Sequence, residues 1–325
     1  MSRPNVFVTR RIPDKGLDLI REVSEVTLLE DDLPPSKDVL LREIAKVDGL
    51  VSLLTDPVDA EVIRSAPQLK VISQFAVGFD NIDTDAATQA GIPVGHTPGV
   101  LTDTTADFAF ALLMAGARRI VEAERYVKAG KWQTWGPTLL MGHDIAGATL
   151  GIVGMGRIGQ AMAKRATGFG MRILYNNLDE VDLPPGISAE RCDLDTLLTE
   201  SDFVSLHTSL TPDTRHLIDA RAFALMKPSC VLINTARGPV VDPDALYTAL
   251  KEGEIAFAAL DVTAPEPIPM ESPLLTLDNC LVAPHIASSS IGTRTRMAVM
   301  TANNLIAGLK GERLPHCANP QVYGS

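Results

Sequence analysis

Three polar residues in the last third of the sequence have the types needed for proton transfer and carboxylate binding. Arg237, Glu266 and His285 each stand within a few residues of an apolar run typical of a strand. In a doubly wound sheet, ligands bind at the carboxyl ends of the strands, so the three side chains are expected to converge there. A guanidinium binds a carboxylate through two parallel hydrogen bonds, a histidine can give a proton to a carbonyl oxygen, and a neighbouring carboxylate holds the histidine's tautomer and favours its charged form. The combination suits reduction of a keto acid by hydride transfer.

Each of these residues also has an ordinary structural interpretation. A lone Arg or Glu after a strand is usually a solvated loop charge, and lone histidines are often structural. The remaining histidines are interpreted as structural: His96, His143, His207, His216 and His316. Catalysis is favoured over these interpretations only because the same chain carries a motif for a dinucleotide.

That motif is a glycine-rich loop of the pattern GxGxxG. It comprises Gly154, Met155, Gly156, Arg157, Ile158 and Gly159. An apolar strand precedes it and a helical run follows it, which is the setting that distinguishes a phosphate-binding loop from a chance cluster of glycines. The first glycine makes the tight turn, the second lets the backbone approach a pyrophosphate, and the third lets helix and strand pack closely. The helix N-terminus then offers free amides to the phosphates.

The strand after this loop ends near Asn177, where the adenosine ribose is expected. Asp179, Glu180 and Asp182 follow, and no Lys or Arg occurs between positions 172 and 191. An acid at this place binds the ribose 2′-hydroxyl, whereas a 2′-phosphate needs a cation. The sequence therefore favours NAD(H) as cofactor, with NADP(H) as the alternative.

Strand and helix patterns alternate along most of the chain. This alternation predicts an α/β protein with two doubly wound parallel-sheet domains, the larger of them a Rossmann dinucleotide-binding domain. Helices are expected at about 14–23, 60–65, 104–117 and 294–308. The predicted domains are a substrate-binding domain over residues 1–100, the dinucleotide-binding domain over 101–287, and a return to the substrate-binding domain over 288–325.

Composition excludes several other classes of protein. The formal net charge is −11, which disfavours nucleic-acid binding because that requires clustered cations. The four cysteines form no CxxC pair, so no metal site is expected. No signal peptide is recognised, and no apolar stretch reaches the ~18 residues of a membrane helix. The protein is interpreted as cytoplasmic, with no membrane partner.

Three segments around the polar residues resemble the D-isomer-specific 2-hydroxyacid dehydrogenases. They read NTARGPVVD over 234–242, LDVTAPEP over 260–267 and PHIAS over 284–288. The runs at 6–13, 97–106 and 156–161 are similar to the glyoxylate/hydroxypyruvate reductase branch of that family, and the resemblance covers nearly the whole chain. It implies NAD(P)-dependent reduction of glyoxylate or hydroxypyruvate to the D-2-hydroxy acid, by an enzyme that is usually a homodimer.

The resemblance also implies a set of site residues. Arg237 would bind the substrate carboxylate, His285 would be the acid/base and Glu266 its partner. The backbone amides of Val77 and Gly78 would help to hold the carboxylate. Further residues are expected to line the cofactor or substrate: Thr105, Arg157, Ile158, Asn177, Thr235, Asp261 and Ser288.

Two positions depart from the branch, and three rival functions remain. Leu139 stands where the branch often has a tryptophan that reaches the partner's substrate pocket, and Leu178 stands where NADPH-using relatives tend to have an arginine. Within the enzymes, D-lactate and 3-phosphoglycerate dehydrogenases are the alternatives. From another class, a dinucleotide-sensing protein like the related transcriptional co-repressors keeps the same three polar residues. Little in the sequence marks a second phosphate site, and no long tail suited to recruiting partners is present.

Overall fold

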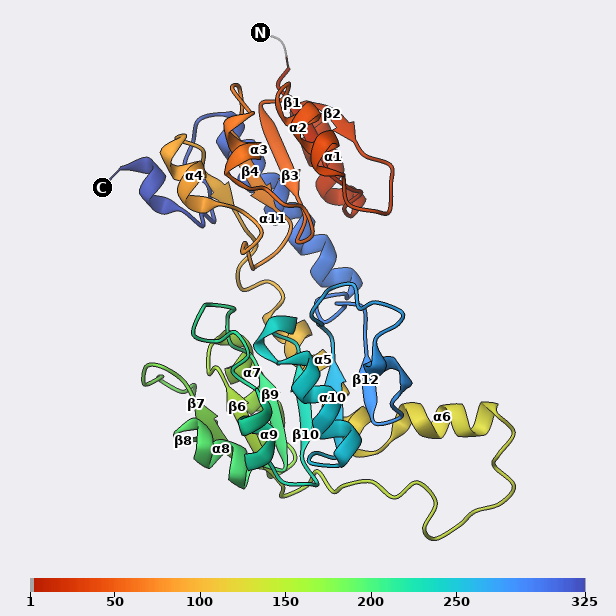
Figure 1. Ribbon diagram of the computed structural model, residues 1–325. Coiled ribbons are helices and arrows are strands. Elements are labelled where there is room, and N and C mark those ends of the chain that lie inside the picture. Colours follow the sequence, from red (N-terminus) through yellow and green to blue (C-terminus); the bar gives the residue numbers. More distant parts are fainter. Residues whose placement is uncertain (1–2, 325) are drawn as a thin grey trace. The chain divides into compact units, whose positions relative to one another are not determined.

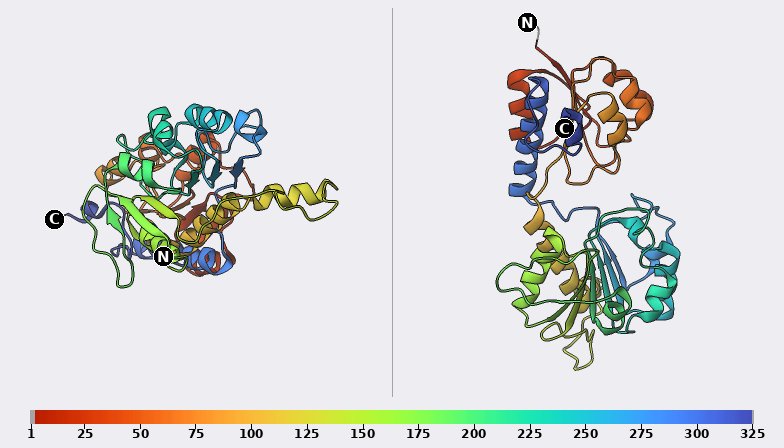
Figure 2. Two further views of the ribbon diagram at one scale, coloured as in Figure 1. Left: turned by 90° about the horizontal axis from the view of Figure 1, so that it is seen from below. Right: turned by 90° about the vertical axis from the view of Figure 1, so that its left-hand side faces the viewer.

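The computed structural model describes residues 3–324, which divide into two compact units. Unit 1 consists of residues up to Leu101 together with the segment from Ser289 onward, and unit 2 runs from Thr102 to Ser288. Each unit has one parallel β-sheet with helices on both faces (Figures 1 and 2). The predicted fold class, an α/β protein with two parallel-sheet domains, is therefore confirmed.

The sheet of unit 1 has five parallel strands in the order β2-β1-β3-β4-β5. Their bounds are β1 Asn5–Val8, β2 Glu25–Leu28, β3 Gly49–Ser52, β4 Val71–Gln74 and β5 Val94–Gly95. β3 and β4 are buried along their whole length, as expected for central strands of a parallel sheet covered on both sides. β2 lies at the edge and is partly exposed, which explains why its sequence has no strong strand pattern.

Two layers of helices cover this sheet. α1 (Asp14–Val23) and α11 (Ile291–Leu309) pack on one face, and α2 (Lys37–Ile44), α3 (Ala60–Arg64) and α4 (Thr84–Gln89) pack on the other. A short 3₁₀ turn, Pro320–Tyr323, follows near the end. α1 and α11 approach closely at Gly16, where a Cβ atom would stand 2.6 Å from the Cβ of Ala298. α11 starts three residues before the predicted position because the Ser290 side chain caps it by accepting from the Thr293 amide.

The sheet of unit 2 has seven parallel strands in the order β12-β11-β10-β9-β6-β7-β8. Their bounds are β6 Thr149–Val153, β7 Arg172–Asn176, β8 Glu190–Arg191, β9 Phe203–Leu206, β10 Val231–Asn234, β11 Phe257–Leu260 and β12 Cys280–Val282. The strand order reverses on the two sides of β6, so the switch point lies between β6 and β9. Ligands of doubly wound sheets bind at the carboxyl ends of the strands beside such a point.

Helices cover both faces of this sheet as well. α5 (Thr102–Ala117) and α7 (Arg157–Thr167) pack on one face, and α8 (Leu194–Glu200), α9 (Ala220–Leu225) and α10 (Pro243–Glu252) pack on the other. Two 3₁₀ turns, Gly238–Val240 and Pro273–Thr276, follow β10 and precede β12. Arg165 of α7 pairs with Asp103 and Asp107 of α5, which ties these two helices together on the surface.

One segment of unit 2 stands away from its core. α6 (Ile120–Lys128) has no buried residue, and it leads into an irregular stretch up to Met141; we call residues 120–141 the arm (Figure 1). Arg119 turns the chain from α5 into the arm with a left-handed φ of 52°. Within residues 3–324, no helix combines the length and the apolar character needed to cross a membrane.

Candidate active site

Arg237 is held by a turn at the carboxyl end of β10. The last residue of that strand, Asn234, is buried; its Oδ1 accepts from the Ala236 amide at 3.0 Å and its Nδ2 donates to the Arg237 carbonyl at 3.0 Å. A side-chain amide that satisfies both groups of a turn fixes the turn as a backbone pair would. Asn234 thus positions the turn that carries Arg237. This role was not predicted, because the only sign of it in the sequence is an Asn at the end of an apolar strand.

Glu266 and His285 are brought into direct contact in the loops after β11 and β12. His285 Nδ1 lies 2.5 Å from Glu266 Oε1, and the second oxygen, Oε2, accepts from the Thr263 amide at 3.3 Å. Their side chains are 27% and 35% exposed, so both groups are reachable from outside unit 2. With Nδ1 engaged by the carboxylate, Nε2 is the ring nitrogen left for a reacting molecule.

The backbone around His285 is held by Asp261. The Asp261 carboxylate is buried and accepts from the amides of Ile286 (2.7 Å) and Ala287 (2.8 Å), while its carbonyl accepts from the His285 amide. His285 itself has a left-handed φ of 53°, which a non-glycine residue adopts only when its surroundings impose it. The resemblance implies that Asp261 lines the cofactor cleft; its contacts make it the residue that fixes the His285 loop.

The electrostatics of the pair favour a charged Glu266. Burial raises the pKa of the Glu266 carboxyl, but the hydrogen bond and charge of His285, the Thr263 amide and the positive charge of Arg237 together hold this pKa below its ordinary value. Burial has the opposite net effect on Asp261, whose pKa is raised in spite of its two amide donors. Arg237, Glu266 and His285 follow the adjacent parallel strands β10, β11 and β12, so all three lie at the carboxyl edge of the sheet.

Two of the three glycines of the glycine-rich loop stand where no side chain fits. Gly154 has a φ of +94°, and a Cβ there would stand 2.8 Å from backbone atoms of His207 and Thr208. A Cβ at Gly159 would stand 2.2 Å from the Gly154 carbonyl oxygen, whereas a Cβ at Gly156 would meet no atom within 4 Å. The first and third glycines are thus demanded by the fold, and the second opens onto free space.

Two further observations fit a dinucleotide at this place. Gly156 is the N-cap of α7, and no side chain caps the helix, so its first amides and partial positive charge remain for an anion. The Thr235 hydroxyl, beyond β10, is buried and has no hydrogen-bond partner among residues 3–324, which suits a group that a cofactor would satisfy. Gly154, Gly156, Arg157, Ile158, Gly159 and Thr235 remain the predicted cofactor residues.

A cation that was not predicted from the sequence lies beside the end of β7. Asn177 Oδ1 accepts from the Met155 amide at 3.1 Å and so links the strand end to the glycine-rich loop. The short strand β8 pairs with β7 and brings Arg191 alongside, where its guanidinium donates to the carbonyls of Asn177 and Leu178. No Lys or Arg occurs in the sequence between positions 172 and 191, but β8 closes the intervening loop and brings the Arg191 guanidinium to the end of β7.

The remaining predicted residues lie elsewhere in the two units. Thr105 is buried in the first turn of α5, and Ser288 is half-buried at the end of unit 2. Val77 and Gly78 belong to unit 1, in the loop after β4. Within residues 3–324, neither of their amides donates a hydrogen bond to the protein.

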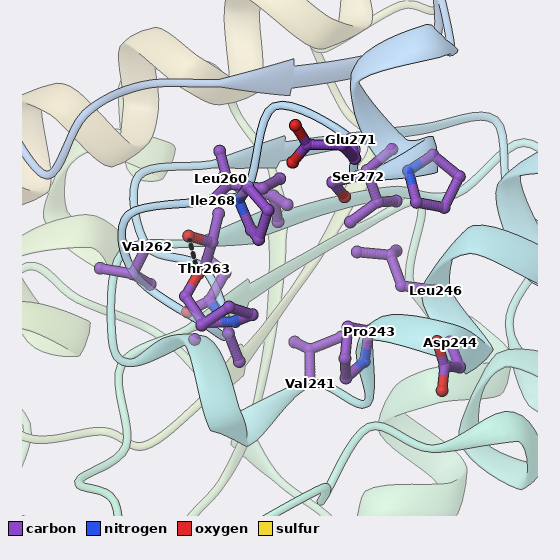
Figure 3. Close-up of a pocket in the computed structure, with 17 residues that line it drawn as sticks. Val241, Pro243, Asp244, Leu246, Leu260, Val262, Thr263, Ile268, Glu271 and Ser272 are labelled. Carbon is purple, nitrogen blue, oxygen red and sulfur yellow. Dashed lines mark hydrogen bonds between the residues drawn. The ribbon is translucent and has the colours of Figure 1, made fainter.

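A cavity of about 350 Å³ lies behind the loop that carries Glu266. Figure 3 shows Leu260, Ile268, Val241 and Leu246 around it, with a hydrogen bond from the Thr263 hydroxyl to the Pro265 carbonyl along one wall. Arg237, Glu266 and His285 are not among its lining residues. This apolar cavity is therefore distinct from the polar site.

Known proteins resemble this chain over most of its length. Residues 110–287 match the family model described as the D-isomer specific 2-hydroxyacid dehydrogenase, NAD binding domain. A glyoxylate reductase of Korarchaeum cryptofilum is 56% identical, over 98% of this chain and 97% of its own. A Thermus thermophilus protein of known structure is 47% identical with a TM-score of 0.92, over 97% of this chain and 99% of its own.

A third relative was solved with ligands. The NADPH-dependent glyoxylate/hydroxypyruvate reductase of Sinorhizobium meliloti, in complex with NADP and malonate, is 30% identical with a TM-score of 0.84. The match covers 98% of this chain and 98% of the other.

Proposed function

The chain belongs to the D-isomer specific 2-hydroxyacid dehydrogenases, and we propose that it reduces glyoxylate to glycolate, and hydroxypyruvate to D-glycerate, with a nicotinamide dinucleotide. The observation that carries this proposal is the contact of His285 Nδ1 with Glu266 at 2.5 Å, in a unit that also carries a glycine-rich loop at the switch point of its sheet. The names of the full-length relatives support the choice of substrate.

Each polar residue has one task in this reaction. Arg237 binds the substrate carboxylate, assisted by the amides of Val77 and Gly78, and so orients the neighbouring carbonyl. Bound reduced nicotinamide supplies the hydride. His285 gives a proton from Nε2 to the carbonyl oxygen as negative charge develops there. Glu266 stabilises the protonated imidazole beforehand, and Asp261 holds its backbone.

NADH is proposed as the preferred cofactor. Leu178 is 95% exposed at the end of β7, and the exposed acids Asp179 and Glu180 follow it, so a 2′-phosphate would meet negative charge. Arg191 is a cation beside this strand end, and its guanidinium already donates to two carbonyls. This arrangement supports NADH over NADPH.

A homodimer assembled through the arm is also proposed. The arm exposes large apolar side chains that its own unit does not cover, with exposed fractions of 60% for Trp132, 78% for Trp135 and 65% for Met141. Apolar surface gathered in one projecting segment is typical of a protein–protein interface. Light scattering on the wild type should give the mass of two chains, and Trp135→Ser should shift the equilibrium toward one.

The location is proposed to be cytoplasmic. Cys192, Cys230, Cys280 and Cys317 are all free thiols, the state that reducing compartments maintain.

The test is turnover with a panel of glyoxylate, hydroxypyruvate, pyruvate and 3-phosphohydroxypyruvate, each with NADH and NADPH. Glyoxylate and hydroxypyruvate should have the highest kcat/KM. His285→Ala should lower kcat by roughly 10²–10⁴-fold with unchanged NADH affinity, whereas the exposed His143→Ala should behave as the wild type. Preference for pyruvate or the phosphorylated acid would favour the rival dehydrogenases, and NADH binding without turnover would favour a dinucleotide sensor.

A further inference from the structure

The loop from Phe75 to Asp80, which carries Val77 and Gly78, is anchored by two amide side chains, one of them buried and the other half-buried. Gln74, the last residue of β4, has Nε2 2.7 Å from Oδ1 of Asn81, the residue that follows the loop. The two amide side chains thus close the loop at its base. We propose that Gln74 and Asn81 are positioning residues that fix the Val77 and Gly78 amides for the substrate carboxylate.

The hydrogen bonds that link Ser52, Gln74 and Asn81 can form with only one orientation of each amide side chain. Asn81 Nδ2 donates to the carbonyls of Leu53 (3.0 Å) and Asp56 (2.8 Å), so Oδ1 must be the atom that faces Gln74. Gln74 must then present Nε2 to Asn81, which leaves Oε1 to accept from the Ser52 hydroxyl at 2.6 Å. Turning either amide would place two donors or two acceptors against each other. The order of donors and acceptors therefore fixes the orientation of both amide side chains.

The far end of this hydrogen-bond network is rigid because it is buried in the core of unit 1. Ser52, Asp56 and Gln74 are fully buried. The Asp56 carboxylate accepts from the Thr9 hydroxyl and, at 2.6 Å, from the Leu53 amide. The network thus ties the loop to the ends of β1 and β3, and its buried hydrogen bonds are costly to break because a freed donor or acceptor would not reach water.

The network acts on the loop that presents the amides. Gln74 Nε2 also lies 3.5 Å from the Gly78 carbonyl, and the Val77 carbonyl accepts from His96 Nδ1 at 2.9 Å. In a trans peptide the N–H points opposite to the C=O of the same plane. The Gly78 amide, which shares its plane with the Val77 carbonyl, is therefore turned away from His96 and left for an anion.

This inference rests on the carboxylate-binding role proposed above for Val77 and Gly78. Neither Gln74 nor Asn81 is assigned a contact with substrate or cofactor, and their effect would be transmitted through the loop. Loss of the network should consequently weaken binding of the acid more than it slows chemistry. Binding of NADH should be unaffected, because the glycine-rich loop belongs to unit 2.

The experiment compares Asn81→Ala and Gln74→Met in the full-length protein. KM for glyoxylate and the inhibition constant of oxamate, an unreactive analogue of the acid, should rise by roughly 10-fold or more, since charge-assisted hydrogen bonds depend on aligned donors. kcat should change less, and the Kd of NADH by fluorescence titration should stay at the wild-type value. Gln74→Met nearly keeps the volume of the buried side chain, so it should fold and can test the inference even if Asn81→Ala does not fold.

Ser73→Ala is the matched control. Ser73 is the buried neighbour of Gln74 in β4, and its hydroxyl donates to the Thr301 carbonyl of α11 at 2.8 Å. Its removal should lower Tm without changing KM for glyoxylate. Wild-type KM and oxamate inhibition in a folded Asn81→Ala or Gln74→Met protein, or an equal rise in KM for Ser73→Ala, would overturn the inference. A wild type that does not reduce glyoxylate, or Arg237→Met with unchanged KM, contradicts the proposed function instead.

Discussion

Glu266 accepts the Nδ1 proton of His285 across 2.5 Å, and the same carboxylate accepts from the Thr263 amide with its other oxygen. Both Glu266 oxygens are thereby engaged, so the carboxylate cannot rotate away without breaking a hydrogen bond. The imidazole is consequently held with its opposite nitrogen, Nε2, available for proton transfer.

The first prediction concerns the pH dependence of turnover. The pKa of Glu266 lies below its ordinary value, so the carboxylate stays charged into the acid range and supports protonated His285. Glu266→Gln removes that charge, and keto-acid reduction, which needs protonated His285, should then decline at lower pH than in the wild type. The measurement is kcat/KM for glyoxylate against pH.

Glu271→Gln is the control for this prediction, because Glu271 is exposed and lines the separate apolar cavity. Its profile should match that of the wild type. The lowered pKa of Glu266 also makes folding stability depend on pH. Ionised Glu266 should stabilise the folded state at pH values above the ordinary pKa of a glutamate, and this stabilisation should be lost as pH falls through the lowered pKa. A Glu266→Gln profile that coincides with the wild type would contradict the pairing.

The second prediction concerns Asp261→Asn. Two amides, those of Ile286 and Ala287, donate to different oxygens of the Asp261 carboxylate, but an asparagine offers only one acceptor. The loop should relax from its left-handed conformation at His285, and kcat should fall by roughly 10- to 100-fold, as expected for a buried donor left unpaired. NADH titration and the exposed variant Asp244→Asn serve as controls. Unchanged kcat in Asp261→Asn would show that the loop holds its shape without the carboxylate.

The third prediction concerns Gly156→Val. A Cβ at Gly156 meets no protein atom within 4 Å, so the variant should fold, but its side chain would enter the space assigned to the pyrophosphate. Overpacking of that kind costs ~1–3 kcal/mol, which weakens NADH binding by roughly 5- to 150-fold. Gly168→Val, at the other end of α7, is the matched control. Tight NADH binding by folded Gly156→Val would refute the cofactor site.

The fourth prediction concerns cofactor choice. Wild-type protein should have a higher kcat/KM with NADH than with NADPH, and Leu178→Arg should shift the ratio toward NADPH by roughly 10- to 100-fold through a charge-assisted phosphate contact. Leu178→Gln introduces a polar side chain without a charge, so it should leave the ratio of kcat/KM for NADH and NADPH unchanged. A wild type that prefers NADPH would instead make Arg191, which lies beside Leu178, the residue to replace next.

Much of the fold follows from local patterns in the sequence. Apolar runs of strand length predicted the central strands, since both faces of a parallel sheet are buried. The patterns fail at β2 and β8, which are short edge strands with exposed positions. Local patterns also did not predict α6. No residue of this helix is buried against its own unit, so it has no apolar stripe that packs on the core.

The candidate site divides in the same way. That Glu266 and His285 follow adjacent parallel strands could be expected from the chain order, and the structure brings them into contact; their roles stay predictions. The left-handed φ of His285 and its anchoring by Asp261 depend on how β11 and β12 are aligned in the sheet. Arg191 reaches Leu178 only because β8 closes a loop. Such relationships arise between segments, so no local pattern contains them.

The split composition of unit 1 has a consequence for synthesis of the protein on the ribosome. Unit 2 is one uninterrupted stretch and can fold as soon as it has emerged, but unit 1 needs α11, which is translated roughly two hundred residues after β5. Until then, Val51 and Val71 lack the apolar cover that α11 provides. Although α1 covers part of this face, the nascent chain lacks the rest of its cover until α11 is made, and a chaperone that binds apolar surface would have its longest opportunity to act there.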